Sequence, residues 1–255
     1  MFVPVPVAPG STGLDLGAEW TRRWTATWRT AGDEVSRTVR DLAHTRIADG
    51  TPMRWFSWRW AQRHRPNLQF LVSTGRHHGA ESLEEARLLL VLYFAAGLVD
   101  VLSQPLHLLF DTATGRRGHI PDFLVVTRAG VWQIDVRPRV LIAPEHLEAF
   151  AATAEVALAC GWHYTVAAGW RDHVAVAVDA FSSQRRPLSD PLGIRPVLVA
   201  AAREGGTFGE LADTTSYPPL ARAQLLHLLW HRRLGTDLGR ASGDRSVVIN
   251  PAGEA

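Results

Sequence analysis

The stretch between residues 119 and 137 limits the possible folds of this chain more than any other part. Two apolar runs, residues 119–127 and 131–137, are separated only by residues 128–130, which include a glycine. Such an arrangement predicts a β-hairpin. Each run carries one aspartate, Asp122 in the first and Asp135 in the second. We therefore expect the hairpin to bring two carboxylates close together.

The residues beside Asp135 predict the direction of its side chain. Because side chains alternate across a strand, Asp135 and Arg137 share one face, whereas Ile134 and Val136 face the core. The ordinary alternative is that two polar residues lie exposed beside a turn, but carboxylates within apolar strands need a partner or a metal. Asp122, Asp135 and the backbone carbonyl of Val136 would offer oxygen ligands to Mg²⁺ or Mn²⁺.

The flanking segments predict a mixed α/β core. Three segments have helical spacing: residues 81–95, 144–160 and 172–186. Three others are expected to be extended: residues 98–102, 106–110 and 164–168. Residues 112–118 have the composition of a turn region. The predicted order is helix, three strands, helix and strand.

Glu85 in the first of these helices is a candidate third carboxylate. It lies four residues from Glu81, so the two side chains share a helix face, whereas Glu84 points in another direction. Acidic residues are also common in a first helical turn, because the helix dipole favours them there. That explanation suits Glu81 better than Glu85.

Tryptophan and arginine are interleaved in the N-terminal region, which extends to about residue 78. The pattern comprises Trp20, Arg22, Arg23, Trp24, Trp28, Arg29, Arg54, Trp55, Trp58, Arg59 and Trp60. Residues 24–30 and 34–39 predict a second hairpin, with its turn at residues 31–33. Tryptophan beside arginine can stack on nucleobases. Half-buried packing, with the arginines in solvent, is the interpretation we favour.

The C-terminal region predicts a winged helix. Helices are expected at residues 194–203, after the capping pair Thr207 and Glu210, and at residues 220–234, with short extended pieces at residues 236–240 and 245–249. The buried face of the third helix is predicted to contain Leu225, Leu228, Leu229 and Leu234. The residues expected to bind DNA are Arg222, His231, Arg232, Arg233 and Arg245. A solvated basic face or a docking surface for a protein explains them as well.

Composition restricts the function less than the motifs do. All 27 basic residues are arginine, and the formal net charge is +2. A codon preference for arginine explains most of this bias, although arginine also suits phosphate contacts. We expect no membrane span and no signal peptide, because no apolar run is long enough and the start is not basic. The single cysteine, Cys160, agrees with a cytoplasmic protein.

Several short motifs together resemble the endonuclease domain of TnsA-like transposon proteins, over about residues 52–171. The motifs are Gly75, Arg76 and His77; Glu81, Ser82 and Glu85; Ser103, Gln104 and Pro105; Pro121, Asp122 and Phe123; and Asp135, Val136, Arg137 and Pro138. The resemblance implies a restriction-endonuclease-like PD-(D/E)xK core (αβββαβ) at residues 79–186. It further implies an N-terminal β-rich extension at residues 1–78 and a winged-helix-like domain at residues 187–255.

The resemblance also implies roles for individual residues. The implied catalytic residues are Glu85, Asp122, Asp135 and Arg137, and the implied ligands of Mg²⁺ or Mn²⁺ are Glu85, Asp122, Asp135 and the Val136 carbonyl. Arg137 stands where the family usually has lysine. Because arginine keeps its proton, it can stabilise charge but cannot act as a general base. Tyr93 stands where relatives often have an acidic residue.

The implied activity is the nicking of one strand of double-stranded DNA at transposon ends. A separate DDE-type transposase and an AAA+ ATPase regulator are the implied partners. Two alternatives remain: a catalytically weak nuclease fold that serves as a docking platform for both partners, and an unrelated PD-(D/E)xK restriction or repair nuclease. The three carboxylates favour an active enzyme. The C-terminal region and the pair Gln104 and Pro105 favour the TnsA-like interpretation over the unrelated nuclease.

Overall fold

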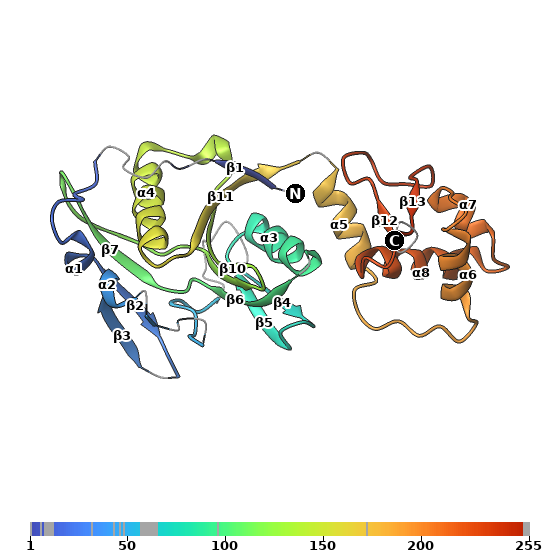
Figure 1. Cartoon of the computed structure of the whole chain (residues 1–255), viewed down its shortest axis with the longest axis horizontal. Coiled ribbons are helices and arrows are strands. Elements are labelled where there is room, and N and C mark those ends of the chain that lie inside the picture. Colours follow the sequence, from blue (N-terminus) through green and yellow to red (C-terminus); the bar gives the residue numbers. More distant parts are fainter. Residues whose placement is uncertain are drawn as a thin grey trace. The chain divides into compact units, whose positions relative to one another are not determined.

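The chain folds into two compact units, one from Phe2 to Gly169 and one from Trp170 onward (Figure 1). This computed structural model describes residues 2–5, 7, 13–31, 33–42, 44–45, 47, 49–56, 66–95, 97–171 and 173–251. Trp58, Arg59 and Trp60, which belong to the N-terminal tryptophan and arginine pattern, lie outside the described residues. The mixed α/β class expected from the sequence is confirmed.

A mixed sheet forms the centre of the first unit. Its strand order is β1(Phe2–Val5), β11(His163–Trp170), β10(Gly130–Val136), β9(Phe123–Thr127) and β6(Leu98–Ser103). β9 pairs antiparallel with both β6 and β10, whereas β10 and β11 are parallel. The predicted hairpin is therefore confirmed. Its turn requires Gly130, whose φ is 138°, a conformation that glycine adopts without a steric penalty.

Two helices cover opposite faces of this sheet (Figure 1): α3(Leu83–Phe94) and α4(Pro144–Ala159). Both lie within the segments predicted to be helical. α3 begins after Ser82, whose hydroxyl accepts a hydrogen bond from the amide of Glu85 at 3.2 Å. Leu102 and Leu124 belong to the same buried cluster as Ala152 and Val156 of α4. The strand face that carries Leu124 is therefore the α4 face.

The N-terminal hairpin is part of this first unit. β2(Thr25–Arg29) and β3(Glu34–Thr38) form a second sheet with β7(His107–Thr112) and β8(Gly115–His119), in the order β3, β2, β7 and β8. Trp24 and Trp28 are buried, which confirms the packing interpretation for these two tryptophans. The short helices α1(Trp20–Arg23) and α2(Val39–Leu42) flank the hairpin in the chain.

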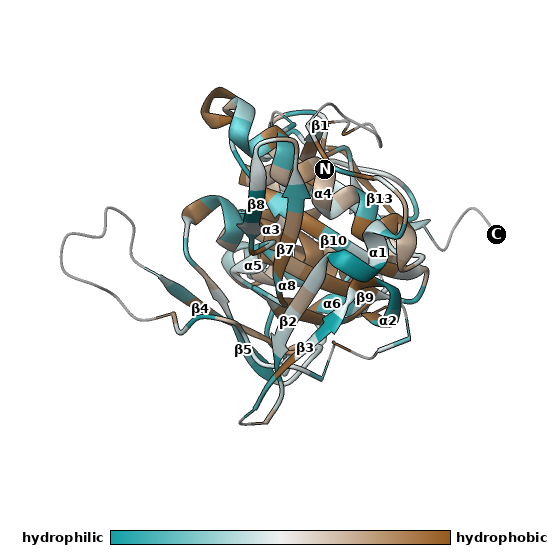
Figure 2. Cartoon of the chain, turned by 90° about the vertical axis from the view of Figure 1, so that its left-hand side faces the viewer, coloured by the Kyte–Doolittle hydropathy of each residue, from teal (hydrophilic) through white to brown (hydrophobic). Residues whose placement is uncertain are grey.

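The segment at residues 112–118, expected to be a turn region, is mostly strand. β8 pairs with β7 from Gly115 to His119, and the turn contains only Ala113 and Thr114. β8 lacks an apolar alternation because it lies at the edge of its sheet and its residues up to Gly118 are exposed. Figure 2 shows this strand in the colours of hydrophilic residues. The expectation was therefore wrong for this strand, which its partner β7 stabilises.

Two smaller elements complete the first unit. β4(Asn67–Leu71) and β5(Arg76–Ala80) form an antiparallel pair that leads into α3. A 3₁₀ turn, η1(Arg139–Leu141), connects β10 to α4. No helix in the described part of the chain is long and apolar enough to cross a membrane.

The second unit is built around the helix α8(Pro218–Trp230). α5(Val174–Ser182), α6(Ile194–Ala201) and α7(Phe208–Asp213) all pack against it, and β12(Gly235–Thr236) pairs with β13(Val248–Ile249). The boundary expected at residues 186 and 187 differs from this division, because α5 packs against α8. The capping pair is confirmed, since the Thr207 hydroxyl accepts from the Glu210 amide and the Glu210 carboxylate accepts from the Thr207 amide.

The third predicted helix ends earlier than expected. The sequence predicted helix as far as residue 234, whereas α8 ends at Trp230. The reason is local, because Arg232 adopts the left-handed conformation with a φ of 54°, which does not continue a helix. The four leucines of the expected inward face are buried, as predicted: Leu225, Leu228, Leu229 and Leu234.

Candidate active site

Asp122 lies immediately before β9, and both its side chain and its backbone carbonyl accept hydrogen bonds. Its side-chain Oδ2 accepts a hydrogen bond from the amide of Val136 at 2.7 Å. Its backbone carbonyl accepts one from the amide of Gln104, also at 2.7 Å. The hairpin register pairs Phe123 with Ile134, so its continuation places Asp122 opposite Asp135. The sequence prediction that the hairpin brings these two aspartates together is confirmed.

Asp135 is almost fully buried, and both of its carboxylate oxygens have partners. The hydroxyl of Tyr164 donates to Oδ2 at 2.7 Å, and Nε2 of His119 lies 2.9 Å from Oδ1. Burial raises the pKa of Tyr164 well above its usual value, and the neighbouring Asp135 charge raises it further. Tyr164 therefore keeps its proton and donates it to Asp135 in a hydrogen bond.

Glu85 approaches from α3 and is also buried. Its Oε2 accepts a hydrogen bond from the amide of Glu81 at 2.8 Å, and its Oε1 accepts one from the Ser82 hydroxyl at 2.7 Å. Burial raises the pKa of Glu85, and these two hydrogen bonds oppose that effect. The Glu85 side chain thus closes the first turn of its helix through these two hydrogen bonds.

The three carboxylates interact electrostatically through Asp122. Burial raises the pKa of Asp122 well above its usual value, and the charges of Asp135 and Glu85 raise it further. The hydrogen bond from Val136 opposes this rise. Neither Asp122 nor Glu85 forms an ion pair with a basic side chain of the described residues. The site therefore gathers three carboxyl groups, none of which pairs with an arginine within those ranges.

The three carboxylates are chemically suitable ligands for a divalent cation, but their positions suit one less well. Carboxylate oxygens are the ligands of Mg²⁺ and Mn²⁺, and the repulsion at Asp122 is what a divalent cation would relieve. Yet within the described ranges no group of three or more His, Cys, Asp or Glu residues is placed to hold a metal ion. The two outer carboxylates lie on different faces of the sheet, because Asp135 shares the face of Leu124 and Glu85 belongs to α3.

Arg137 makes its hydrogen bonds to backbone carbonyls. Its amide donates to the Ala167 carbonyl at 3.0 Å, and its side-chain Nε donates to the Leu141 carbonyl at 3.2 Å. No ion pair joins Arg137 to an acidic side chain among the described residues. The expected proximity of Arg137 to the carboxylates is thus not seen as a direct contact. Val136, expected to offer its carbonyl, offers its amide to Asp122.

His119 and Tyr164 are site residues that the sequence interpretation did not identify. His119 ends β8, which was expected to be a turn, and Tyr164 lies on β11, beyond a helix. The one sequence signal was the histidine three residues before Asp122. Gln104, which the sequence interpretation placed in a motif without a role in the site, also stands out, because it has a φ of 48° and its buried Oε1 has no hydrogen-bond partner in the described part of the chain. A strained conformation of this kind is frequent at functional sites.

The basic residues expected to bind DNA fall into two groups in the second unit. Arg222 forms an ion pair with Asp244 and lies 5.7 Å from the centre of the Phe208 ring. Four others are exposed: His231, Arg232, Arg233 and Arg245. The first three of them follow the end of α8 and do not lie on the helix. Arg222 therefore stabilises its own unit, while the four others lie at the surface.

The sequence matches no protein-family model, and a search of curated proteins finds no match. The fold and the site residues therefore carry the functional argument.

Proposed function

We propose that this chain is a metal-dependent DNA endonuclease with a PD-(D/E)xK core, similar to TnsA-like transposon subunits. The observation that carries the proposal is the proximity of Asp122 and Asp135 at the end of the β9–β10 hairpin, where the charge of Asp135 raises the pKa of Asp122. Asp122 also interacts electrostatically with Glu85 of α3. Two aspartates on a hairpin and a glutamate on the preceding helix reproduce the set of acidic residues that the resemblance implies.

The order of elements around this site supports the proposal. The central sheet and its helices follow one another along the chain as α3, β6, β9, β10, α4 and β11, with β7 and β8 inserted after β6. Without that insertion the order is αβββαβ, which the resemblance implies. In the second unit, α6, α7 and α8 are followed by the β12–β13 pair, an order that agrees with the implied winged-helix-like domain, and α5 precedes them.

Each residue of the site has a distinct task in this proposal. Asp122, Asp135 and Glu85 would hold Mg²⁺ or Mn²⁺, with the Val136 carbonyl as a further oxygen. When bound, such an ion would neutralise charge at the phosphodiester and lower the pKa of the attacking water. Tyr164 and His119 orient Asp135 through its two oxygens. Arg137 supplies positive charge for the phosphate, because its guanidinium cannot lose its proton.

The wider role follows from the resemblance. The substrate is double-stranded DNA at transposon ends, of which this subunit nicks one strand. A DDE-type transposase acts on the other strand, and an AAA+ ATPase regulates both. The place of action is the cytoplasm, at the nucleoid.

A second candidate function is a docking platform with weak or no nuclease activity. Two observations favour it: both Asp135 oxygens are occupied by protein donors, and Arg137 is bound to the Leu141 carbonyl. In this case the acidic site stabilises the fold, and the chain presents surfaces to the transposase and the ATPase.

Strand nicking of a plasmid that carries the transposon ends distinguishes the two functions. The chain is assayed with Mg²⁺ or Mn²⁺, alone and with its partner proteins. We expect Asp122→Asn to abolish nicking and Mn²⁺ binding measured by calorimetry. The matched control, Asp33→Asn, removes an exposed acid from the β2–β3 turn and should leave both unchanged. If Asp122→Asn nicks DNA at the parental rate, the proposal that the chain is an endonuclease with this active site is wrong. A parent that binds its partners but never nicks DNA supports the platform.

A further inference from the structure

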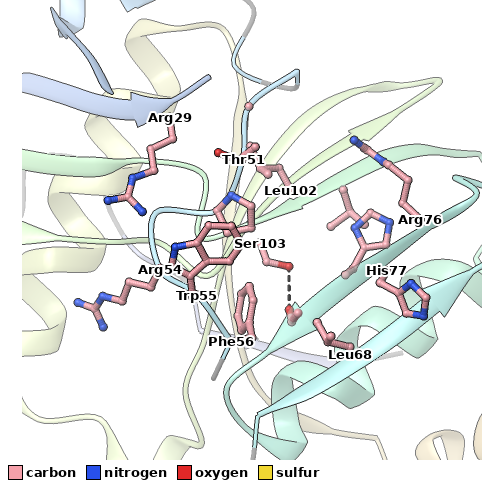
Figure 3. A pocket seen from close by; sticks show the side chains of 15 residues that line it. Arg29, Thr51, Arg54, Trp55, Phe56, Leu68, Arg76, His77, Leu102 and Ser103 are labelled. Atoms are coloured by element: carbon pink, nitrogen blue, oxygen red, sulfur yellow. Dashed lines mark hydrogen bonds between the residues drawn. The ribbon is translucent and has the colours of Figure 1, made fainter. Parts of the chain in front are cut away.

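A cavity of about 450 Å³ lies in the first unit, between the β4–β5 pair and the loop at residues 50–56 (Figure 3). This volume is within the range of small-molecule sites, which is about 300–1,000 Å³. Figure 3 shows Trp55 over the centre of the cavity, with Phe56 next to it and Leu68 across from them. The cavity therefore offers flat aromatic and aliphatic surface.

The floor of the cavity is held firmly. The Phe56 ring lies directly on Gly79, so that a Cβ at this glycine would come within 2.1 Å of the ring. The hydroxyl of Ser103 donates to the Gly79 carbonyl at 2.7 Å, which joins β5 to β6 (Figure 3). A side chain larger than hydrogen at Gly79 would displace Phe56. The site is thus formed before any ligand binds.

Trp55 differs from the other tryptophans of its region. It is 84% exposed, whereas Trp24 is 0% and Trp28 is 3% exposed. The latter two belong to the core, so packing explains them. Packing does not explain an indole that remains in solvent at the mouth of an apolar cavity. Exposed aromatic rings of this kind provide stacking surfaces for nucleobases.

The charges around the cavity favour an anion. It is lined by Arg29, Arg54, Arg76, His77 and His78, and no acidic side chain of the described residues lines it. Arg29 pairs with Glu34, and Arg76 pairs with Asp100. Arg54 forms no ion pair in the described part of the chain, so its guanidinium is available to a phosphate.

The loop that carries Trp55 is connected to the acidic site through a single residue. The Met53 amide donates to the Gln104 carbonyl at 3.0 Å, and the Gln104 amide donates to the Asp122 carbonyl at 2.7 Å. Ser103, which lines the cavity, is paired with Phe123, the neighbour of Asp122. The cavity and the acidic site are therefore neighbours within the first unit.

We propose that the cavity binds one unpaired nucleotide of the DNA substrate, with its base stacked on Trp55 and its phosphate at Arg54. The inference rests on the proposed function for the identity of the ligand. Phe56 and Leu68 enclose the base, while the phosphate lies next to Arg54. The site holds a strand that is separated from its complement next to the position of cleavage.

The test measures the affinity for a fluorescein-labelled oligothymidine strand by anisotropy, without divalent metal, over a series of salt concentrations. Base stacking on an aromatic side chain predicts that Trp55→Ala weakens binding roughly 5- to 100-fold. Trp55→Phe should retain most of the affinity. Arg54→Gln should reduce the slope of log affinity against log salt by about 0.7, the value for one phosphate of a single strand.

Tyr217→Ala provides the matched control, because Tyr217 is an exposed aromatic residue of the second unit and its loss should not affect binding. Oligothymidine binding by Trp55→Ala that equals parental binding would overturn the inference. The assays distinguish failure of this inference from failure of the proposed function. If the parent binds oligothymidine through Trp55 but nicks no DNA, the nucleotide-binding site is supported and the endonuclease proposal is wrong. If the parent nicks DNA while Trp55→Ala binds oligothymidine normally, the endonuclease proposal is supported and the nucleotide-binding site is wrong.

Discussion

Replacement of Asp122 by asparagine should stabilise the protein while it removes the proposed activity. In the folded chain the Asp122 charge is desolvated and repelled by Asp135 and Glu85, which raises its pKa. Asparagine removes the charge, and its side-chain carbonyl can still accept the hydrogen bond from Val136 that Oδ2 now accepts at 2.7 Å. The repulsion is therefore lost without the loss of a hydrogen bond.

The expected gain depends on pH in a defined direction. Because folding raises the pKa of Asp122, the folded protein holds a proton that the unfolded chain releases. This contribution to stability is complete below the usual pKa of 3.8 and is lost as the pH rises through the folded value. The advantage of Asp122→Asn should therefore be near zero below pH ~4 and should increase toward neutral pH.

The magnitude follows from the free energy that accompanies a raised pKa. A tenfold change in an acid dissociation constant corresponds to about 1.4 kcal/mol, and substitutions that relieve such sites commonly add about 0.5–2 kcal/mol. For a unit that extends from Phe2 to Gly169, 1 kcal/mol raises the melting temperature by roughly 2–4 °C. We expect a gain of about 1–8 °C near pH 8.

Thermal unfolding followed by circular dichroism measures this gain at several pH values, beside the control Asp33→Asn. Added Mg²⁺ should raise the melting temperature of the parent and leave that of Asp122→Asn unchanged, because the ion neutralises the charge that asparagine lacks. A variant that is less stable than the parent at pH 8, or whose advantage does not depend on pH, would refute the reasoning.

Three further predictions concern other residues. Tyr164→Phe should lower the free energy of unfolding by about 1.5–3 kcal/mol in urea titrations, because buried Asp135 loses a hydrogen bond to its charge. Arg137→Lys should preserve nicking in the plasmid assay and Arg137→Ala should lower it strongly; equal rates would make the residue structural. Replacing Arg232 and Arg233 with alanine should reduce the slope of log duplex affinity against log salt concentration by about one for each phosphate that the protein no longer neutralises. If the slope is unchanged and binding of the ATPase is lost, the two arginines contact the ATPase and not DNA.

The local pattern of the sequence determined the regular elements. Alternation of apolar residues, interrupted at Gly130, was enough to predict the β9–β10 hairpin and hence the meeting of Asp122 with Asp135. The capping pair Thr207 and Glu210 likewise predicted the start of α7. These features depend on residues close together in the chain, and their hydrogen bonds form within the element itself.

The tertiary structure decided everything that depends on distant segments. His119 and Tyr164 reach Asp135 from β8 and β11, and no periodicity within either strand indicates that contact. β8 itself is a strand because β7 pairs with it, since its own sequence lacks apolar residues at the strand spacing. Exposure likewise depends on the whole fold, which buries Trp24.

Trp24 and Trp55 show that the sequence alone does not determine which side chain is available to a ligand. Both occur beside arginine in the N-terminal pattern, and the sequence supported a single interpretation for all of these tryptophans. Packing of β2 against β7 and α4 places Trp24 in the core, whereas the loop before β4 leaves Trp55 in solvent above a cavity. The chemistry of a side chain is set by its type, but its availability to a ligand is set by which surfaces the fold brings against it.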